Sequence, residues 1–141
     1  MVKRTASKRV DKSRAPQYAE TGRVFLESAQ ALADVADDGA PYGNAIALLA
    51  IHAAISYSDA LTIAFGELKS ADEHTKAADT LRSVLGSRLP TDQVKSFRTI
   101  LQEKDAVSYQ GTYYTLADGR KLLKRSRTFC AWALELFQTR P

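Results

Sequence analysis

Apolar residues recur every three or four positions along most of this chain, and that spacing predicts α-helices. A first helix is expected to begin at Pro16, which suits the first helical turn, and to end before Asp37. A second helix is expected from Pro41 to Phe65. Because this helix is apolar nearly all round, it is typical of a helix buried in a core. Residues 66–69 are expected to form the loop that follows it.

Three further helices follow, and each has its own start signal. Two of them begin with a potential capping box, Ser70 with Glu73 and Thr115 with Asp118. Between these two, Pro90-Thr91-Asp92 begins another helix. The chain is therefore expected to contain a short third helix and four longer ones.

The overall pattern favours a helical bundle, because only the short stretch 107–115 is compatible with a strand. Long helices joined by short loops favour antiparallel neighbours. At 141 residues the chain is long enough to bury a core within one domain. The sequence therefore predicts an all-α fold, an up-and-down four-helix bundle with a short additional helix, over residues 16–141.

The positive net charge of +4 belongs to the N-terminal end of the chain. Residues 1–14 contain six basic residues and one acidic residue, so that the rest of the chain carries a net charge of −1. Because this stretch has few apolar residues, residues 1–15 are expected to form a disordered basic arm. Such an arm either keeps the protein soluble or adds salt-sensitive affinity for nucleic acid.

Cysteine usage and hydropathy point to the cytoplasm. Cys130 is the single cysteine and lies in an apolar stretch, so it is expected to be a buried, reduced thiol. The basic N-terminus lacks the apolar stretch of a secretory signal. No segment is expected to supply the about 20 apolar residues of a membrane helix. A cytoplasmic protein without a membrane partner is therefore predicted.

The apolar second helix carries His52, Ser56 and Asp59 on one stripe, at positions i, i+4 and i+7. Burying an unpaired carboxylate is costly, so Asp59 needs a cation. The apolar face of the fourth predicted helix, continued by three residues from Leu101, reaches Lys104. We therefore predict an ion pair between Asp59 and Lys104.

Two other segments are candidates for ligand contact. Residues 108–114 form a polar aromatic loop that includes Tyr109 and Tyr113, and it is expected either to close the end of the bundle as a lid or to bind phosphates and bases. On the last helix, Lys121, Lys124 and Arg125 recur at i, i+3 and i+4. These three belong either to a solvated face or to a strip that follows a phosphate backbone.

The remaining residue types exclude several kinds of site. His52 and His74 both fall on apolar helix faces, where hydrogen-bonded packing residues are expected. No His or Cys pair has the spacing of metal ligands, and no glycine-rich phosphate loop is present in the sequence. No metal and no cofactor are therefore expected.

Four segments carry a resemblance to a known family: AIHAAISYSDA at 50–60, DEHTKAA at 72–78, KDAVSY at 104–109 and AWA at 131–133. In these residues, and in the order of its helices over residues 16–138, the chain resembles the HEPN domains. These are small four-helix-bundle modules of prokaryotic nucleotide- and RNA-related systems. The resemblance implies a helical bundle and a homodimer that forms near residues 104–114.

The chain departs from the ribonuclease members of that family at their catalytic motif. Those members carry an Arg followed a few residues later by a His, and two such motifs meet across a dimer to cleave RNA without a metal. Here the matching positions hold Lys104 and Tyr109. A lysine contacts phosphate as a point charge and not as a bidentate fork, and a neutral tyrosine is a poor base compared with histidine.

The resemblance therefore implies a non-catalytic binding or partner module. Such a module docks a companion protein of the nucleotidyltransferase or toxin–antitoxin type, or binds nucleotide or RNA. The alternative is a metal-independent endoribonuclease that uses Lys104 and Tyr109. The candidate ligand-contact residues are Asp59, Lys104, Tyr109, Tyr113, Lys121, Lys124 and Arg125.

Overall fold

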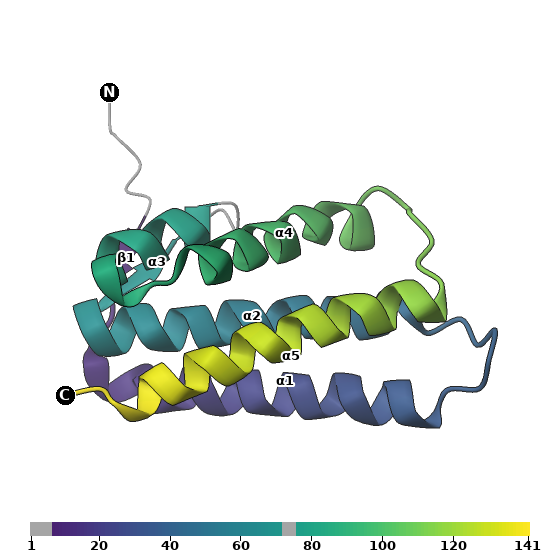
Figure 1. The fold of residues 1–141 in the computed structure, drawn as a ribbon, viewed down its shortest axis with the longest axis horizontal. Helices are drawn as coiled ribbons and strands as arrows, with labels where there is room; N and C mark the ends of the chain where they lie inside the picture. The colour runs from purple at the N-terminus through teal and green to yellow at the C-terminus, as the bar shows by residue number, and fades with distance from the viewer. Residues whose placement is uncertain (1–6, 72–75) are drawn as a thin grey trace.

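A computed structural model describes residues 7–71 and 76–141 of the chain. It is an all-α fold in which four long helices run alternately up and down, with one short helix beside them (Figure 1). The predicted fold class is confirmed. The helices are α1 (Ala15–Val35), α2 (Gly43–Gly66), α3 (Ala77–Leu85), α4 (Thr91–Ser108) and α5 (Leu116–Gln138).

Helix α2 is the centre of the bundle and packs against all four other helices. Its burial on every side explains why its sequence is apolar nearly all round. By length and composition alone α2 is apolar enough to cross a membrane, so the expectation that no segment reaches that length is wrong. Most of its apolar stretch is buried inside the bundle, and the core helix of a bundle meets the same criterion.

Helices α1 and α5 each pack along α2 but touch each other far less. Close packing of α1 on α2 depends on Gly22, because a Cβ atom there would lie 2.8 Å from Cδ2 of Tyr57. The aromatic ring of Tyr57 therefore passes beneath α1 at a position where any side chain would collide with it. Between α1 and α5 the surface is left open.

The loop between α4 and α5 is bonded to the N-terminal end of α2. The side chain of Asn44 donates a hydrogen bond to the carbonyl oxygen of Thr112 and accepts one from the backbone N–H of Tyr114, each at 2.8 Å. The predicted capping box of Thr115 with Asp118 is confirmed and begins α5. No strand forms over residues 107–115, because α4 continues to Ser108 and the rest is loop.

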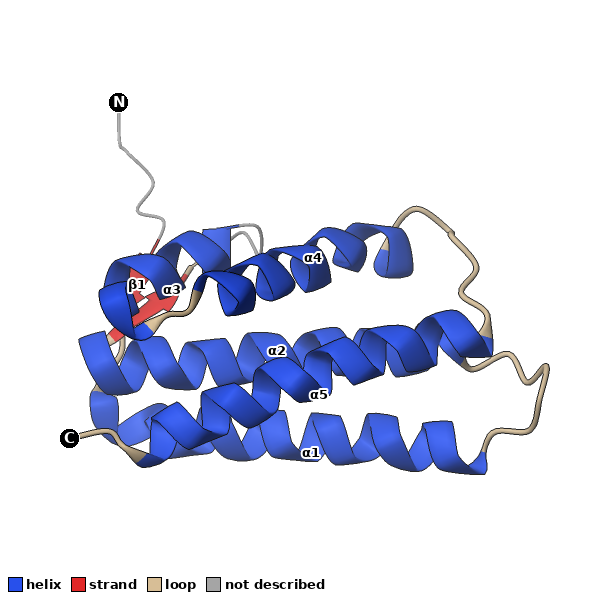
Figure 2. Ribbon diagram, in the orientation of Figure 1, coloured by secondary structure: helices blue, strands red, loops and turns tan. Residues whose placement is uncertain are grey.

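A short antiparallel ribbon covers the other end of α2 (Figure 2). Its strands are β1 (Ser7–Arg9) and β2 (Leu68–Ser70), and a 3-10 turn leads from the ribbon into α1. Val10 is buried after the first strand, and its N–H donates to the carbonyl of Glu67. The expected disordered arm is therefore wrong for residues 7–15, and the expected loop at 66–69 is wrong where β2 begins.

The start of the third helix was expected at Ser70 with Glu73. Residues 72–75, which include Glu73 and His74, lie outside the described residues. Within the described part of the chain, α3 begins at Ala77 and ends before a second 3-10 turn at Gly86–Arg88.

Candidate functional site

Asp59 is buried on α2 beneath the ribbon, and its cation is Lys69. The Oδ2 atom of Asp59 lies 4.0 Å from Nζ of Lys69, and Lys8 of β1 adds a second positive charge nearby. Burial raises the pKa of Asp59 to about 7, although the two lysines act against the rise. The carboxyl group is therefore held in an environment that favours its protonated form.

The predicted ion pair between Asp59 and Lys104 is wrong. Helix α4 runs antiparallel to α2, so Lys104 in its last turns lies beside the N-terminal half of α2 near His52. His52 and Asp59 are seven positions apart, which is roughly 10 Å along a helix. The ribbon, which the sequence pattern does not reveal, supplies the lysine that Asp59 requires.

Lys104 is turned into the bundle and is only 7% exposed. Its ammonium nitrogen lies 5.3 Å from the centroid of the Tyr109 ring, in a cation–π contact. The neighbouring His52 is half-buried against Phe25, with ring centroids 5.7 Å apart. Burial, and then the charge of Lys104, lower the pKa of His52, so this imidazole is neutral at pH 7.

The tyrosine loop has one buried and two exposed tyrosines. Tyr114 is buried, and its hydroxyl donates a hydrogen bond of 2.8 Å to Glu103, so this residue packs as a lid on the bundle. Tyr109 and Tyr113 remain on the surface, at 76% and 62% exposed. They are available for contact with another molecule.

The basic residues of α5 divide between two sides of the helix. Lys121 and Arg125 line a hollow of about 320 Å³ between α4 and α5, in which Glu103 and Asp118 supply as many negative charges. Lys124 instead lines a hollow together with residues of α1. The three residues that were expected to form one strip are therefore separated, and Lys124 belongs with other basic residues of α5.

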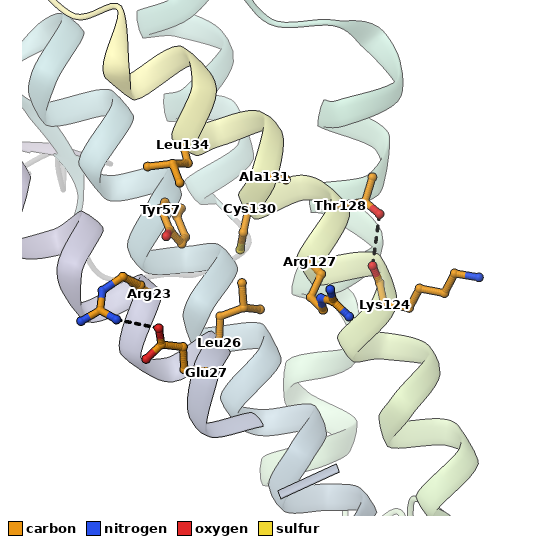
Figure 3. A pocket seen from close by; sticks show the side chains of 10 residues that line it. All are labelled: Arg23, Leu26, Glu27, Tyr57, Lys124, Arg127, Thr128, Cys130, Ala131 and Leu134. Atoms are coloured by element: carbon orange, nitrogen blue, oxygen red, sulfur yellow. Dashed lines mark hydrogen bonds and ion pairs between the residues drawn. The ribbon is translucent and has the colours of Figure 1, made fainter. Parts of the chain in front are cut away.

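Lys124 lies in an open groove between α1 and α5. The groove consists of two adjoining hollows of about 640 and 500 Å³, which share Lys124 and Arg127. We refer to this feature as the α1–α5 groove. Figure 3 shows its larger hollow, where the side chain of Lys124 extends away from the bundle and Tyr57 lies between the two helices. The larger hollow is lined by Arg23, Leu26, Glu27, Tyr57, Lys124, Arg127, Thr128, Cys130, Ala131 and Leu134.

Most basic side chains of the groove already have partners. Arg23 forms ion pairs with Glu20 and Glu27 on its own helix. Arg120 donates to the carbonyl oxygens of Ala33 and Ala36, and so caps the C-terminal end of α1. Arg127 donates one hydrogen bond of 3.0 Å to Gln30.

Lys124 differs from these arginines because the described residues supply no partner for its charge. Its ammonium group makes no hydrogen bond or ion pair with any residue in the ranges 7–71 and 76–141, and the side chain is exposed. Arg127 is exposed as well and keeps further N–H donors beyond the one that Gln30 accepts.

Tyr57 supplies a polar group at the floor of the groove. The residue is only 4% exposed, and its hydroxyl forms no hydrogen bond with any described residue, although it is not sealed from the groove. Burial raises the pKa of Tyr57, so the hydroxyl stays neutral and is able both to donate and to accept. The sequence pattern does not single out Tyr57, and in the structure its opposition to Gly22 distinguishes it from the aliphatic residues around it.

Cys130 also lines the larger hollow, but its thiol has low reactivity. It is a free and buried cysteine, as expected, and burial raises its pKa to about 12. A thiol with so high a pKa has little thiolate at neutral pH and is a weak nucleophile. Among the described residues, no group of His, Cys, Asp or Glu side chains is arranged to hold a metal ion.

Comparison with known proteins gives a fold and no family. No protein-family model matches the chain, and no curated protein matches it. The crystal structure of the protein TT1696 from Thermus thermophilus is similar, with a TM-score of 0.69 over 86% of this chain and 97% of that chain. The two sequences are 21% identical, and at that level the likeness supports the helical fold alone.

Proposed function

We propose that this protein is a non-catalytic, HEPN-like binding module that binds RNA through its phosphates along the α1–α5 groove. The observation that carries the proposal is the exposed and unengaged ammonium group of Lys124 at the junction of two hollows. Phosphate contacts of this kind supply most of the sequence-independent affinity of proteins for nucleic acids.

The charge of the groove supports an anionic ligand. Each of its two hollows is lined by three basic side chains and one acidic side chain. The hollow between α4 and α5 has two of each, so it offers no net attraction for phosphate. In the groove, Arg120, Lys124 and Arg127 are spaced at i, i+4 and i+7, which places them on one side of α5 at steps of about 5 to 6 Å.

The position of Lys104 supports binding without cleavage. A ribonuclease needs one group that contacts the phosphate and another that takes the proton of the attacking 2′-hydroxyl. Lys104 is buried and lies against the face of the Tyr109 ring, so it does not present its charge to a substrate. We expect no metal-independent cleavage of labelled RNA. Products that disappear in Tyr109→Phe would favour the endoribonuclease alternative.

The proposed binding is tested with two variants that remove equal charge from the same helix. Fluorescence anisotropy of labelled single-stranded RNA is measured over a range of salt for the wild type, for Lys124→Gln/Arg127→Gln, and for the control Lys121→Gln/Arg125→Gln. Each cation that contacts a phosphate contributes about 0.7 to the slope of log affinity against log salt. The first variant should lower that slope by about 1.4. The control should leave it unchanged, and equal effects of the two variants would refute the proposal.

A second candidate function is docking of a protein partner at the end of the bundle. It is favoured by three exposed tyrosines, Tyr42, Tyr109 and Tyr113, which come from the two loops that Asn44 joins. Tyrosine is enriched in protein interfaces. The partner is a second copy of this chain or a companion protein of the nucleotidyltransferase or toxin–antitoxin type. Sedimentation of the wild type and of Tyr109→Ser/Tyr113→Ser tests self-association, which the double variant should abolish.

A further inference from the structure

Tyr57 is a buried residue, but its hydroxyl forms no hydrogen bond within the described part of the chain and is open to the α1–α5 groove. Polar groups in largely buried places normally find a partner, so this hydroxyl bonds to water or to a ligand. Its position is fixed by packing, because the ring lies against the Cα of Gly22, where even a Cβ would come within 2.8 Å of it. The hydroxyl is therefore held at a defined place in the α1–α5 groove.

The hollow that contains that hydroxyl has an apolar part beside its charged side chains. Leu26, Ala131 and Leu134 line the same hollow, and Leu134 is 38% exposed. An apolar floor with a few fixed polar groups is typical of a site that binds a small ring system. The volume of about 640 Å³ lies within the range of such sites, about 300 to 1,000 Å³.

Lys124 and Arg127 line the same hollow as Tyr57. A ligand that fits this hollow therefore combines a phosphate group, for the cations, with a ring, for the apolar floor. In duplex RNA the bases are stacked and paired, and a protein reaches mainly phosphates and 2′-hydroxyls. An unpaired nucleotide instead offers an apolar base face, a free polar base edge and a phosphate together.

We infer that the α1–α5 groove selects an unpaired nucleotide, whose base rests on the apolar floor and accepts or donates a hydrogen bond at the Tyr57 hydroxyl while its phosphate contacts Lys124. This inference rests on the proposed RNA binding and adds the class of RNA, single-stranded. The groove follows α5 from Arg120 to Leu134, about 21 Å at about 1.5 Å per residue. It is therefore longer than one nucleotide and continues along a strand.

The experiment uses the full chain and four probes, whose affinities are compared per phosphate. They are oligoadenylate, oligouridylate, the duplex that these two strands form, and inorganic polyphosphate with the same number of phosphates. Affinities are compared for the wild type, Tyr57→Phe and the control Tyr18→Phe, which removes the same atom from a tyrosine of α1 that does not line the groove. We expect the wild type to bind the single strands more tightly than the duplex or polyphosphate.

Tyr57→Phe should weaken binding of a single strand by roughly 2- to 10-fold, the effect of one hydrogen bond, and should leave the duplex and polyphosphate unchanged. Because the lost hydroxyl has no partner within the described structure, the melting temperature should not fall. A second variant, Leu134→Asp, places a charge on the exposed edge of the floor and should weaken the same single strands.

The possible results separate this inference from the proposed function. If all four probes bind equally and depend on Lys124 and Arg127, while Tyr57→Phe and Leu134→Asp change nothing, phosphate binding stands and base recognition is refuted. If no probe binds, both are refuted. If Tyr18→Phe weakens the single strands as much as Tyr57→Phe does, the hydroxyl of Tyr57 has no special role and the inference is wrong.

Discussion

Replacing Asp59 by asparagine should make the protein more stable at pH 8, although the change removes an ion pair. The carboxylate is buried on α2, and Lys69 at 4.0 Å does not offset the loss of solvation, since the pKa of Asp59 is raised to about 7. An asparagine at this position keeps the size and polarity of the side chain without its charge. The substitution therefore removes a cost that the native protein carries whenever the carboxyl is ionised.

The sign and size follow from proton linkage. The pKa of Asp59 is about 7 in the folded protein and 3.8 without the fold, so between these values the folded state binds more protons than the unfolded state. The free energy of unfolding therefore falls as pH rises through this window. The two units between pH 5 and the folded pKa, at 1.36 kcal/mol each, give a loss of about 2.7 kcal/mol, which is complete only near pH 8, where the carboxyl is almost fully ionised.

The assay is urea unfolding at pH 5, 6, 7 and 8 for the wild type and Asp59→Asn. We expect the stability of the wild type, relative to the variant, to fall by about 2.7 kcal/mol from pH 5 to pH 8. His52 has a lowered pKa and so changes stability in the opposite direction, but it is present in both proteins and cancels in the difference. Asp79→Asn, at an exposed carboxylate paired with Arg98, is the matched control.

Two results would refute this reasoning. A difference between wild type and Asp59→Asn that does not vary with pH would mean that the carboxyl titrates alike in both states. A variant that is less stable than the wild type at pH 8 would mean that the contact with Lys69 outweighs the cost of burial. In that case Asp59 would act as a stabilising ion pair, as the sequence pattern first suggested with the wrong lysine.

Three further outcomes are expected. Gly43→Ala should lower the unfolding free energy by about 1 to 3 kcal/mol, because its Cβ would collide with the carbonyl oxygens of Tyr114 and Thr115; an unchanged melting temperature would contradict this packing. Asn44→Ala should speed hydrogen exchange at the N–H of Tyr114, which loses its acceptor. Cys130 should react with a thiol reagent at pH 8 only after unfolding, so rapid reaction of the native protein would disprove its burial.

The helices were predictable because their signals are local. The capping box at Thr115 and the apolar repeat of each long helix depend on neighbours within four residues, and the structure places these helices where the pattern does. The ribbon was not predictable in this way. A strand of three residues is too short to show alternation, and its partner lies about 60 positions away, so nothing local distinguishes Ser7–Arg9 from a charged tail.

The candidate site was predicted only in part for a related reason. The sequence offered Lys124 as a candidate for ligand contact but grouped it with Lys121 and Arg125, since periodicity gives the face of a helix and not the neighbours that divide that face. Tyr57 was missed altogether. In an otherwise apolar helix a tyrosine is indistinguishable from a packing residue until the position of its hydroxyl is known.

The groove itself is a consequence of the composition of α2. Because α2 is apolar on every side, α1 and α5 both obtain their main burial from α2 and gain little from contact with each other. Two helices that pack on one central helix in this way leave an open groove between them, here the α1–α5 groove. The side chain of Tyr57 is longer than those of the alanines around it, so its hydroxyl extends from the core to the floor of the α1–α5 groove. Tyr57→Leu should therefore keep the bundle folded, with an unchanged far-ultraviolet circular dichroism spectrum, while it removes the polar group that we propose for recognition of a base.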